Sequence, residues 1–174
     1  MFVLRIGNRG RWTGDQKAQD VEHVEAAAKD LKLGPRHQGL SVFRAETEDE
    51  QREVALRFAL TCRDARPEHV DYVVFPSALA EDLGLIIAHR PYDDLDPYLN
   101  ERHYEMIGLT PELGLRLAAA ILRHDDRRAE RLEKQKLPAL GADLCRRDAQ
   151  VRSYLGDGWP EKLRPLLADP ETGV

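Results

Sequence analysis

Cysteine is scarce in this chain, which has two in 174 residues, Cys62 and Cys145. A scaffold held by several disulfides is therefore excluded, and both cysteines lie in stretches typical of buried free thiols. Long hydrophobic runs are also lacking, because no window approaches the roughly 18 apolar residues of a membrane span. The first residues contain no basic segment followed by a long apolar one. These absences predict a cytoplasmic protein without a membrane partner.

The chain also lacks a basic excess and a catalytic signature. Its 26 Lys and Arg residues against 31 Asp and Glu residues produce a net charge of −5. That balance argues against a general electrostatic attraction to nucleic acid or to anionic membranes. No serine lies in a Gly-x-Ser-x-Gly elbow, and neither cysteine has the surroundings of a catalytic thiol. A nucleophilic hydrolase is therefore not indicated.

What the chain does contain is an alternation of short apolar runs and amphipathic stretches. The apolar runs predict five strands, at residues 2–6, 40–43, 71–75, 85–88 and 103–108. The third run is apolar on both faces, as in a central strand covered on both sides. The alternation predicts an α/β or α+β fold with a single mixed or parallel sheet of about five strands, packed with helices.

Helix-start signals separate these strands. Thr13 with Gln16, and Thr47 with Glu50, have the spacing of a capping box. Thr110 precedes Pro111 at the start of an apolar helix, where proline loses no hydrogen bond. Gly34 followed by Pro35 predicts the end of the first helix.

The composition changes near residue 124. Residues 123–136 carry mixed charge and predict a helix that continues into solvent, with Glu130 and Lys134 at a stabilising spacing. Two further helices are predicted at residues 144–155 and 160–167. We therefore divide the chain into an α/β core domain, residues 1–124, and a charged C-terminal helical extension, residues 125–174.

An acidic, aromatic loop before the fifth strand is the first candidate site. Its carboxylates and imidazoles suit Mg²⁺, Mn²⁺ or Zn²⁺, and His103 and Glu105 would project from one face of a strand. The spacing fits no helical His-Glu-x-x-His pair and no calcium loop. The alternative is a solvated turn whose carboxylates cap turns and pair with arginines. The candidate catalytic residues are Asp93, Asp94, Asp96, His103 and Glu105, and the candidate metal ligands are His89, Asp94, Asp96 and His103.

The glycine-rich segment at residues 7–14 is the second candidate. It lies between a predicted strand and a predicted helix start, where free backbone N–H groups favour an anion. Arg9 and Arg11 add bidentate donors, and Trp12 could stack on a base. The segment is neither a Walker loop nor a dinucleotide fingerprint. Phosphate or nucleotide binding is thus weighed against an ordinary turn with a packed tryptophan.

The arginines of the charged stretch are the third candidate. Arg127, Arg128 and Arg131 could meet nucleic acid through a local basic patch, or an acidic protein partner. The alternative is a solvated helix face.

Taken together, these features favour a small cytoplasmic binding or regulatory protein of bacterial type that acts through a protein partner, in an accessory, immunity or antitoxin-like role. No cofactor is predicted for that function. One rival is a metal-dependent hydrolase or nuclease that uses residues 89–105 and a divalent metal. The other is a nucleotide-binding or RNA-binding protein that uses residues 7–14.

Overall fold

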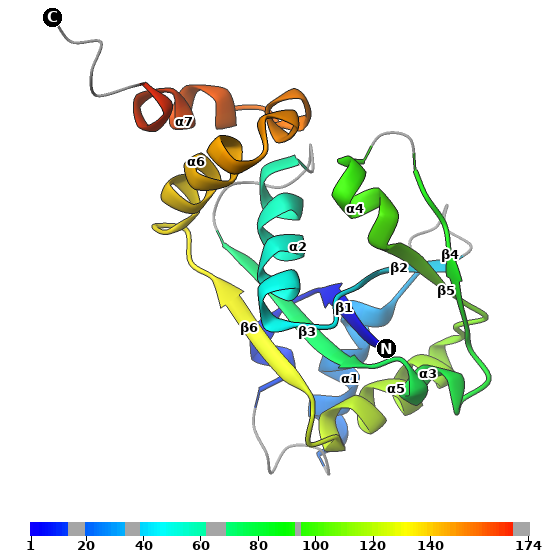
Figure 1. Cartoon of the computed structure of the whole chain (residues 1–174). Coiled ribbons are helices and arrows are strands. Elements are labelled where there is room, and N and C mark those ends of the chain that lie inside the picture. The colour runs from blue at the N-terminus through cyan, green and yellow to red at the C-terminus, as the bar shows by residue number, and fades with distance from the viewer. Residues whose placement is uncertain (14–19, 34–38, 62–68, 93–94, 169–174) are drawn as a thin grey trace, which may run out of the picture.

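A single antiparallel sheet organises the molecule (Figure 1). The computed structural model describes residues 1–13, 20–33, 39–61, 69–92 and 95–168. Within these residues the sheet has the strand order β4-β5-β2-β1-β3-β6, and every neighbouring pair is antiparallel. The strands are β1 (Phe2–Ile6), β2 (Gly39–Arg44), β3 (Val70–Pro76), β4 (Ile86–His89), β5 (His103–Ile107) and β6 (Arg128–Leu132).

Helices cover both faces of this sheet (Figure 1). The face that carries Leu4, Phe43 and Tyr72 is called the upper face, and the face that carries Val3, Val42 and Val73 the lower face. The upper face is covered by α2 (Glu48–Thr61), α4 (Pro97–Arg102), α6 (Leu137–Arg147), the 3₁₀ helix η4 (Ala149–Tyr154) and α7 (Trp159–Leu167). The lower face is covered by η1 (Arg9–Arg11), α1 (Val21–Ala28), η3 (Lys29–Leu31), α3 (Ala78–Glu81) and α5 (Pro111–Arg123).

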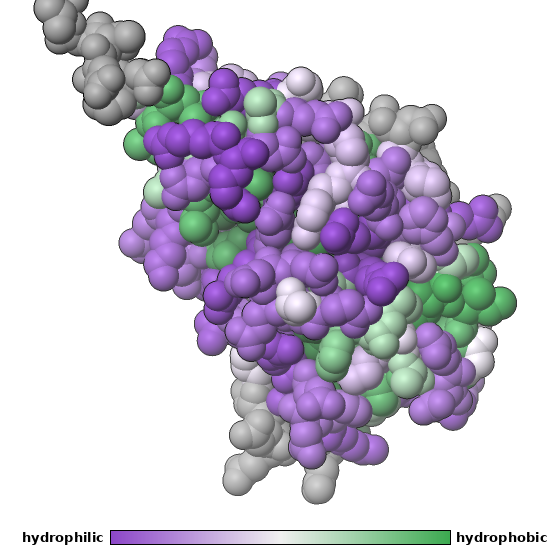
Figure 2. Space-filling view, viewed as in Figure 1, coloured by the Kyte–Doolittle hydropathy of each residue, from purple (hydrophilic) through white to green (hydrophobic). Residues whose placement is uncertain are grey.

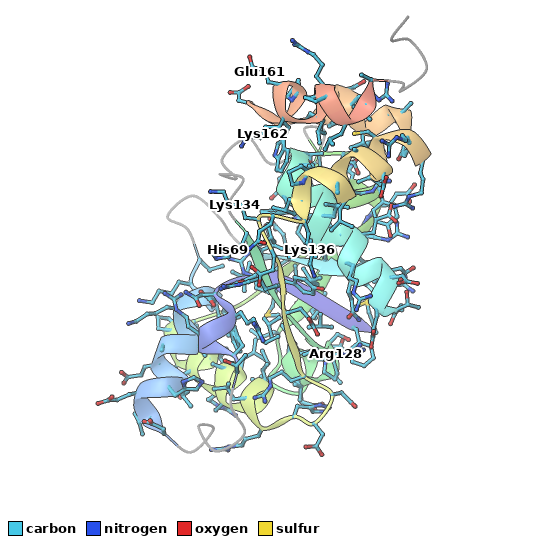
Figure 3. All side chains as sticks on the ribbon, turned by 90° about the vertical axis from the view of Figure 1, so that its left-hand side faces the viewer. His69, Arg128, Lys134, Lys136, Glu161 and Lys162 are labelled. Carbon is cyan, nitrogen blue, oxygen red and sulfur yellow. The ribbon has the colours of Figure 1, made fainter. Side chains whose placement is uncertain are left out.

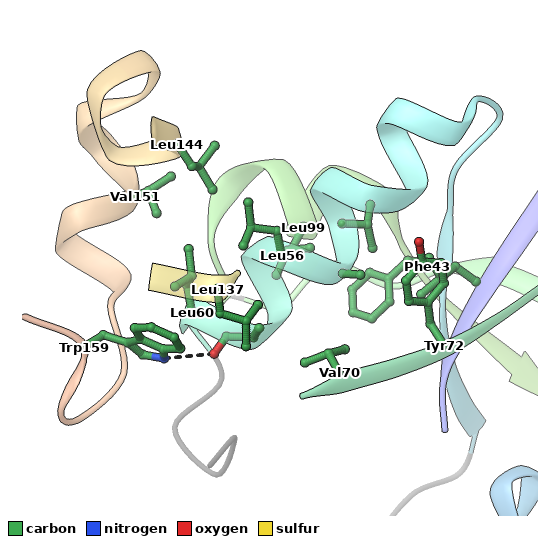
Figure 4. Close-up of a cluster of buried hydrophobic side chains, with 14 of the residues drawn as sticks. Phe43, Leu56, Leu60, Val70, Tyr72, Leu99, Leu137, Leu144, Val151 and Trp159 are labelled. Atoms are coloured by element: carbon green, nitrogen blue, oxygen red, sulfur yellow. Dashed lines mark hydrogen bonds between the residues drawn. The ribbon is translucent and has the colours of Figure 1, made fainter. Parts of the chain in front are cut away.

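The upper core joins the C-terminal helices to α2 and the sheet (Figure 4). Trp159 is almost fully buried, and its indole N–H donates to the backbone oxygen of Ala59 over 3.0 Å. In α6, Gly141 lies against Leu60, where a Cβ would come within 3.0 Å of a leucine methyl. Because these helices bury apolar surface on the rest of the domain, they contribute to its stability.

Several local predictions are confirmed. β3 is buried along its length except at Pro76, as expected for a strand covered on both faces. Glu50 N–H donates to Thr47 Oγ1 over 3.2 Å, and Thr47 N–H donates to Glu50 Oε2 over 3.4 Å, which completes the second capping box. Thr110 caps α5 by accepting from Leu113 N–H.

The predicted sheet type is wrong. The sequence pattern predicts a mixed or parallel sheet of about five strands, whereas the described sheet is antiparallel and has six. An alternation of strands and helices is compatible with parallel and with antiparallel strand pairing. Here α1 lies between β1 and β2 in the chain and packs in the lower core, and β2 pairs with β1 in the antiparallel direction. The fold is therefore α+β.

The predicted charged helix over residues 123–136 is also wrong. α5 ends at Arg123, and five of the following residues form β6 at the sheet edge, paired with β3 from Leu132 opposite Val70 to Arg128 opposite Val74. Mixed charge suits an exposed edge strand as well as a helix face. The division into two domains at residue 124 stays a prediction, although the sheet continues beyond that residue.

Some predictions concern residues outside the described ranges. These include Gln16 of the first capping box, the stop at Gly34 and Pro35, and Cys62. Within the described chain, α1 is capped by Asp20, whose side chain accepts from Glu22 N–H. Cys145 is a buried free thiol as predicted, and burial raises its pKa. None of the described helices is long and apolar enough to cross a bilayer.

Candidate functional site

The described candidate residues of the acidic loop lie in two separate clusters, and Asp96 belongs to the first. Asp96 is 1% exposed and caps α4 by accepting from Leu99 N–H over 3.2 Å. Proline follows it at the first helical position, so Asp96 and Pro97 together were an available signal for this helix. Asp96 also accepts from Arg57 Nη1 over 3.0 and 3.1 Å. A metal ion at Asp96 would have to displace that guanidinium.

Arg57 is the centre of a buried ionic network under the upper helices. Its guanidinium donates to Glu53 over 2.9 Å and to Asp148 over 2.7 Å, in addition to Asp96. It also lies 4.4 Å from the ring centre of Tyr98. Burial by itself would lower the pKa of Arg57, but the three carboxylates outweigh burial and raise it. The network ties α2 to α4 and to the start of η4.

His103 and Glu105 form the second cluster, together with Tyr92. The Tyr92 hydroxyl donates to Glu105 Oε1, and the Tyr92 ring packs edge-on against His103 with the centroids 4.8 Å apart. The hydrogen bond to Glu105 raises the pKa of Tyr92, and burial lowers the pKa of His103. His103 Nδ1 lies 2.5 Å from the backbone oxygen of Arg90, so this nitrogen carries the proton that it donates.

These contacts leave little room for the predicted metal centre in the described chain. Across the described ranges, no group of three or more His, Cys, Asp or Glu side chains is placed to hold a metal ion. His89 packs against Tyr104, with ring centroids 5.1 Å apart. Asp93 and Asp94 lie outside the described residues. The metal-dependent hydrolase therefore stays a prediction that rests on those two aspartates.

The described part of the second candidate, residues 7–13, binds anions, but they are carboxylates of the chain itself. Asn8 N–H donates to Asp30 Oδ2 over 2.9 Å, and the Trp12 indole donates to the same oxygen over 2.8 Å. Arg11 forms an ion pair with the other oxygen of Asp30. Trp12 is fully buried in the lower core, so its ring faces are covered by protein. The described part of this segment is thus fastened to the end of η3.

A second internal carboxylate, Asp71 of β3, fastens the same segment to β6. Arg9 N–H donates to Asp71 Oδ2 over 2.9 Å. Arg131 donates hydrogen bonds to both carboxylate oxygens of Asp71, over 2.6 and 2.9 Å. Asp71 is 5% exposed, and His69 Nε2 lies 3.9 Å from it.

The Asp71 cluster predicts acid sensitivity. Burial by itself would raise the pKa of Asp71, but the bonds from Arg131 and Arg9 outweigh it and lower the pKa below the ordinary 3.8. A carboxylate with a depressed folded pKa stabilises the protein above its unfolded pKa, and this contribution is lost as the pH falls through the folded value. We expect the unfolding free energy to decrease below about pH 4, and Asp71→Asn to flatten that decrease, in urea titrations at several pH values.

A matched control comes from Asp82, an exposed carboxylate after α3. Asp82→Asn should leave the acid slope as it is in the wild type. An equal flattening in both variants would contradict the assignment to Asp71.

The three predicted binding arginines of the charged stretch make contacts within the chain. Arg128 pairs with Glu48, Arg131 with Asp71, and Arg127 Nη1 donates to the backbone oxygen of Leu122. Figure 3 shows the side of the molecule beside β6, with Arg128 toward one end of the strand and His69, Lys134 and Lys136 toward the other. Glu161 and Lys162 lie on α7 above them. Whether these groups bind nucleic acid or a partner stays a prediction.

The two edges of the sheet differ in character. β6 carries Arg128, Glu130 and Arg131, and charged side chains protect an edge from pairing with other chains. β4 reads Ile-Ile-Ala-His, and Ile86 is 63% exposed. In Figure 2 hydrophobic surface gathers over the end of the sheet where β4 and β5 lie. Within the described residues the β4 edge is therefore more apolar than the β6 edge and carries no second strand.

The backbone of β4 also has unused hydrogen-bonding capacity. Arg90 N–H donates to the backbone oxygen of His103, and Ala88 lies opposite Glu105 in the same ladder. Because polar groups alternate in direction along an antiparallel strand, those of Ile87 and His89 face away from β5. Within the described residues no strand pairs with that side. The edge can accept another extended segment.

Comparisons with known proteins add no assignment, because no protein-family model matches the chain and no curated protein or solved structure matches it significantly.

Proposed function

We propose that this chain is a small binding protein that captures an extended segment of a protein partner on the open edge of β4. The observation that carries the proposal is an apolar edge strand with Ile86 63% exposed and no charged side chain before its last residue. Strand addition uses such an edge, since backbone hydrogen bonds supply affinity and alternate side chains supply specificity.

The surroundings of the edge suggest the chemistry of the partner. Ile86 lies opposite Ile107 of β5, so one face of the added strand would meet apolar surface. His89 and Arg90 are exposed at the other end. A segment that alternates apolar residues and carries an acidic residue near Arg90 would complement both features.

This proposal moves the partner surface away from the C-terminal extension. Removing residues 125–174 would delete β6 and expose the core beneath α6 and α7, so loss of binding on truncation would not locate the interface. The metal-dependent and nucleotide-binding alternatives have less support, because described residues of both candidate sites make contacts within the chain.

Two substitutions at the edge test the proposal. Ile86→Lys places a charge in the apolar surface, and His89→Pro removes an outward N–H group without removing one from the internal ladder. We expect each substitution to lower the affinity for a partner protein co-purified from the native host at least tenfold. Binding of a peptide from that partner should also slow hydrogen exchange at Ile87 and His89 in the wild type.

Matched variants separate binding from folding. His89→Ala keeps the N–H group, and Leu140→Lys places the same charge on an exposed leucine of α6. Both should retain the partner. Retention by Ile86→Lys and His89→Pro, or unchanged exchange at Ile87 and His89, would refute the proposal.

A further inference from the structure

A cavity of about 600 Å³ opens in the helical layer beneath the lower face, between α1 with η3 and the start of α5. Its size falls within the range of small-molecule sites, roughly 300–1,000 Å³. Its aliphatic lining comes from Ala28, Leu31, Leu33, Leu109 and Leu115. None of these residues belongs to β4, so the cavity is independent of the edge proposed above to bind a partner.

Gly114 keeps this cavity open. It lies in the first turns of α5 and is buried, yet a Cβ built on it would meet no heavy atom of the described neighbouring residues within 4 Å. Close packing explains the helical Gly141, where a Cβ would come within 3.0 Å of Leu60, but it does not explain Gly114. Glycine weakens a helix relative to alanine. Gly114 therefore leaves empty space at a cost to the helix.

The charged residues in the described lining of the cavity are mainly basic. Lys29 and Lys32 line it and are exposed, and neither makes an ion pair within the described residues. Glu25 is the one carboxylate among the described lining residues. The Thr110 hydroxyl accepts from Leu113 N–H and caps the helix. Two ammonium groups against one carboxylate thus favour an anion beside the apolar lining.

We propose that this cavity binds an amphipathic monocarboxylate. The aliphatic tail lies beside Gly114 among the leucines, where its transfer from water drives binding. The carboxylate lies at Lys29 and Lys32, which fix the orientation of the ligand. Such sites combine an apolar lining with a few polar groups.

Isothermal titration of the full chain with straight-chain carboxylates tests the proposal. Octanoate should bind with one-to-one stoichiometry, and hexanoate, octanoate and decanoate should bind about fourfold more tightly per added methylene. Octan-1-ol, with the same number of carbon atoms and no charge, should bind at least tenfold more weakly than octanoate. Gly114→Leu should abolish octanoate binding by filling the cavity. The double variant Lys29→Gln with Lys32→Gln should lower the affinity for octanoate to the affinity for octan-1-ol.

Two controls match these variants. Arg116→Leu adds the same side chain to α5 at an exposed position outside the lining, and Lys134→Gln removes a lysine elsewhere. Both should bind octanoate as the wild type does. If Gly114→Leu fails to fold, the lysine pair and the comparison with octan-1-ol decide. Absence of octanoate binding, equal binding of octan-1-ol, or unchanged binding in a folded Gly114→Leu variant would overturn the proposal.

Discussion

Asp30→Ala is expected to lower the free energy of unfolding by about 3 kcal/mol. The Asp30 side chain is 8% exposed and accepts from the N–H of Asn8 and the indole of Trp12 while it pairs with Arg11. The substitution leaves the Trp12 donor without a partner, and an unsatisfied buried donor costs its full desolvation penalty. Urea denaturation followed by far-ultraviolet circular dichroism measures the loss.

Two companion variants sharpen this test. Asp30→Asn keeps an acceptor oxygen for Trp12 and removes the charge that pairs with Arg11, so its loss should be smaller. Glu25→Ala removes an exposed carboxylate from α1 and should change the free energy by less than about 0.5 kcal/mol. A loss below about 1 kcal/mol for Asp30→Ala would show that Asp30 does not hold the 7–13 segment in place.

Arg57→Ala is expected to cost about 3–5 kcal/mol of unfolding free energy, because it leaves a buried charge without its partner. Asp96 is 1% exposed, and Arg57 is the cation that its carboxylate meets in the described structure. Asp148 and Glu53 lose a partner as well. The measurement is again urea denaturation, with the slope compared to confirm that the native state stays compact.

The matched control is Arg52, on an exposed part of the same helix. Arg52 lies 3.9 Å from Glu48, and both side chains are more than 60% exposed. Such pairs contribute little, so Arg52→Ala should cost less than about 0.5 kcal/mol. The double variant Arg57→Leu with Asp96→Leu should recover only part of the loss. Apolar residues can replace a buried ion pair, but leucine cannot accept from Leu99 N–H as Asp96 does. Similar losses for Arg52→Ala and Arg57→Ala would contradict this account.

The predicted elements that are confirmed depend on neighbouring residues. β1, β2, β3 and β5 follow from short apolar runs, and α5 follows from Thr110 with Pro111. The capping box of Thr47 and Glu50 has its predicted bonds. α4 was not predicted, although Asp96 and Pro97 mark its start. The same acidic side chains also suit a metal site, so residue type alone does not separate a helix cap from a ligand.

The candidate sites show how far residue type alone can lead. Phosphate or nucleotide binding at residues 7–14 stays a prediction, and the N–H groups of Asn8 and Arg9 bind carboxylates of the chain itself. The anions are Asp30 and Asp71, 22 and 62 positions away in the chain. No local pattern pairs such distant residues. The exposed edge of β4 has no motif either, because a run of Ile, Ile and Ala reads as buried until its neighbours are known.

Apolar strands and helix caps are predictable from the residues alone, because short-range physics controls them. Three features depend on long-range contacts: the antiparallel direction of the sheet, the assignment of Arg128–Leu132 to an edge strand, and the partners of Arg57, Asp30 and Asp71. Local signals arise from dihedral preferences and from hydrogen bonds between residues three or four apart. Strand pairing and buried ion pairs join residues far apart in the chain, and their energies depend on which surfaces the folded core brings together.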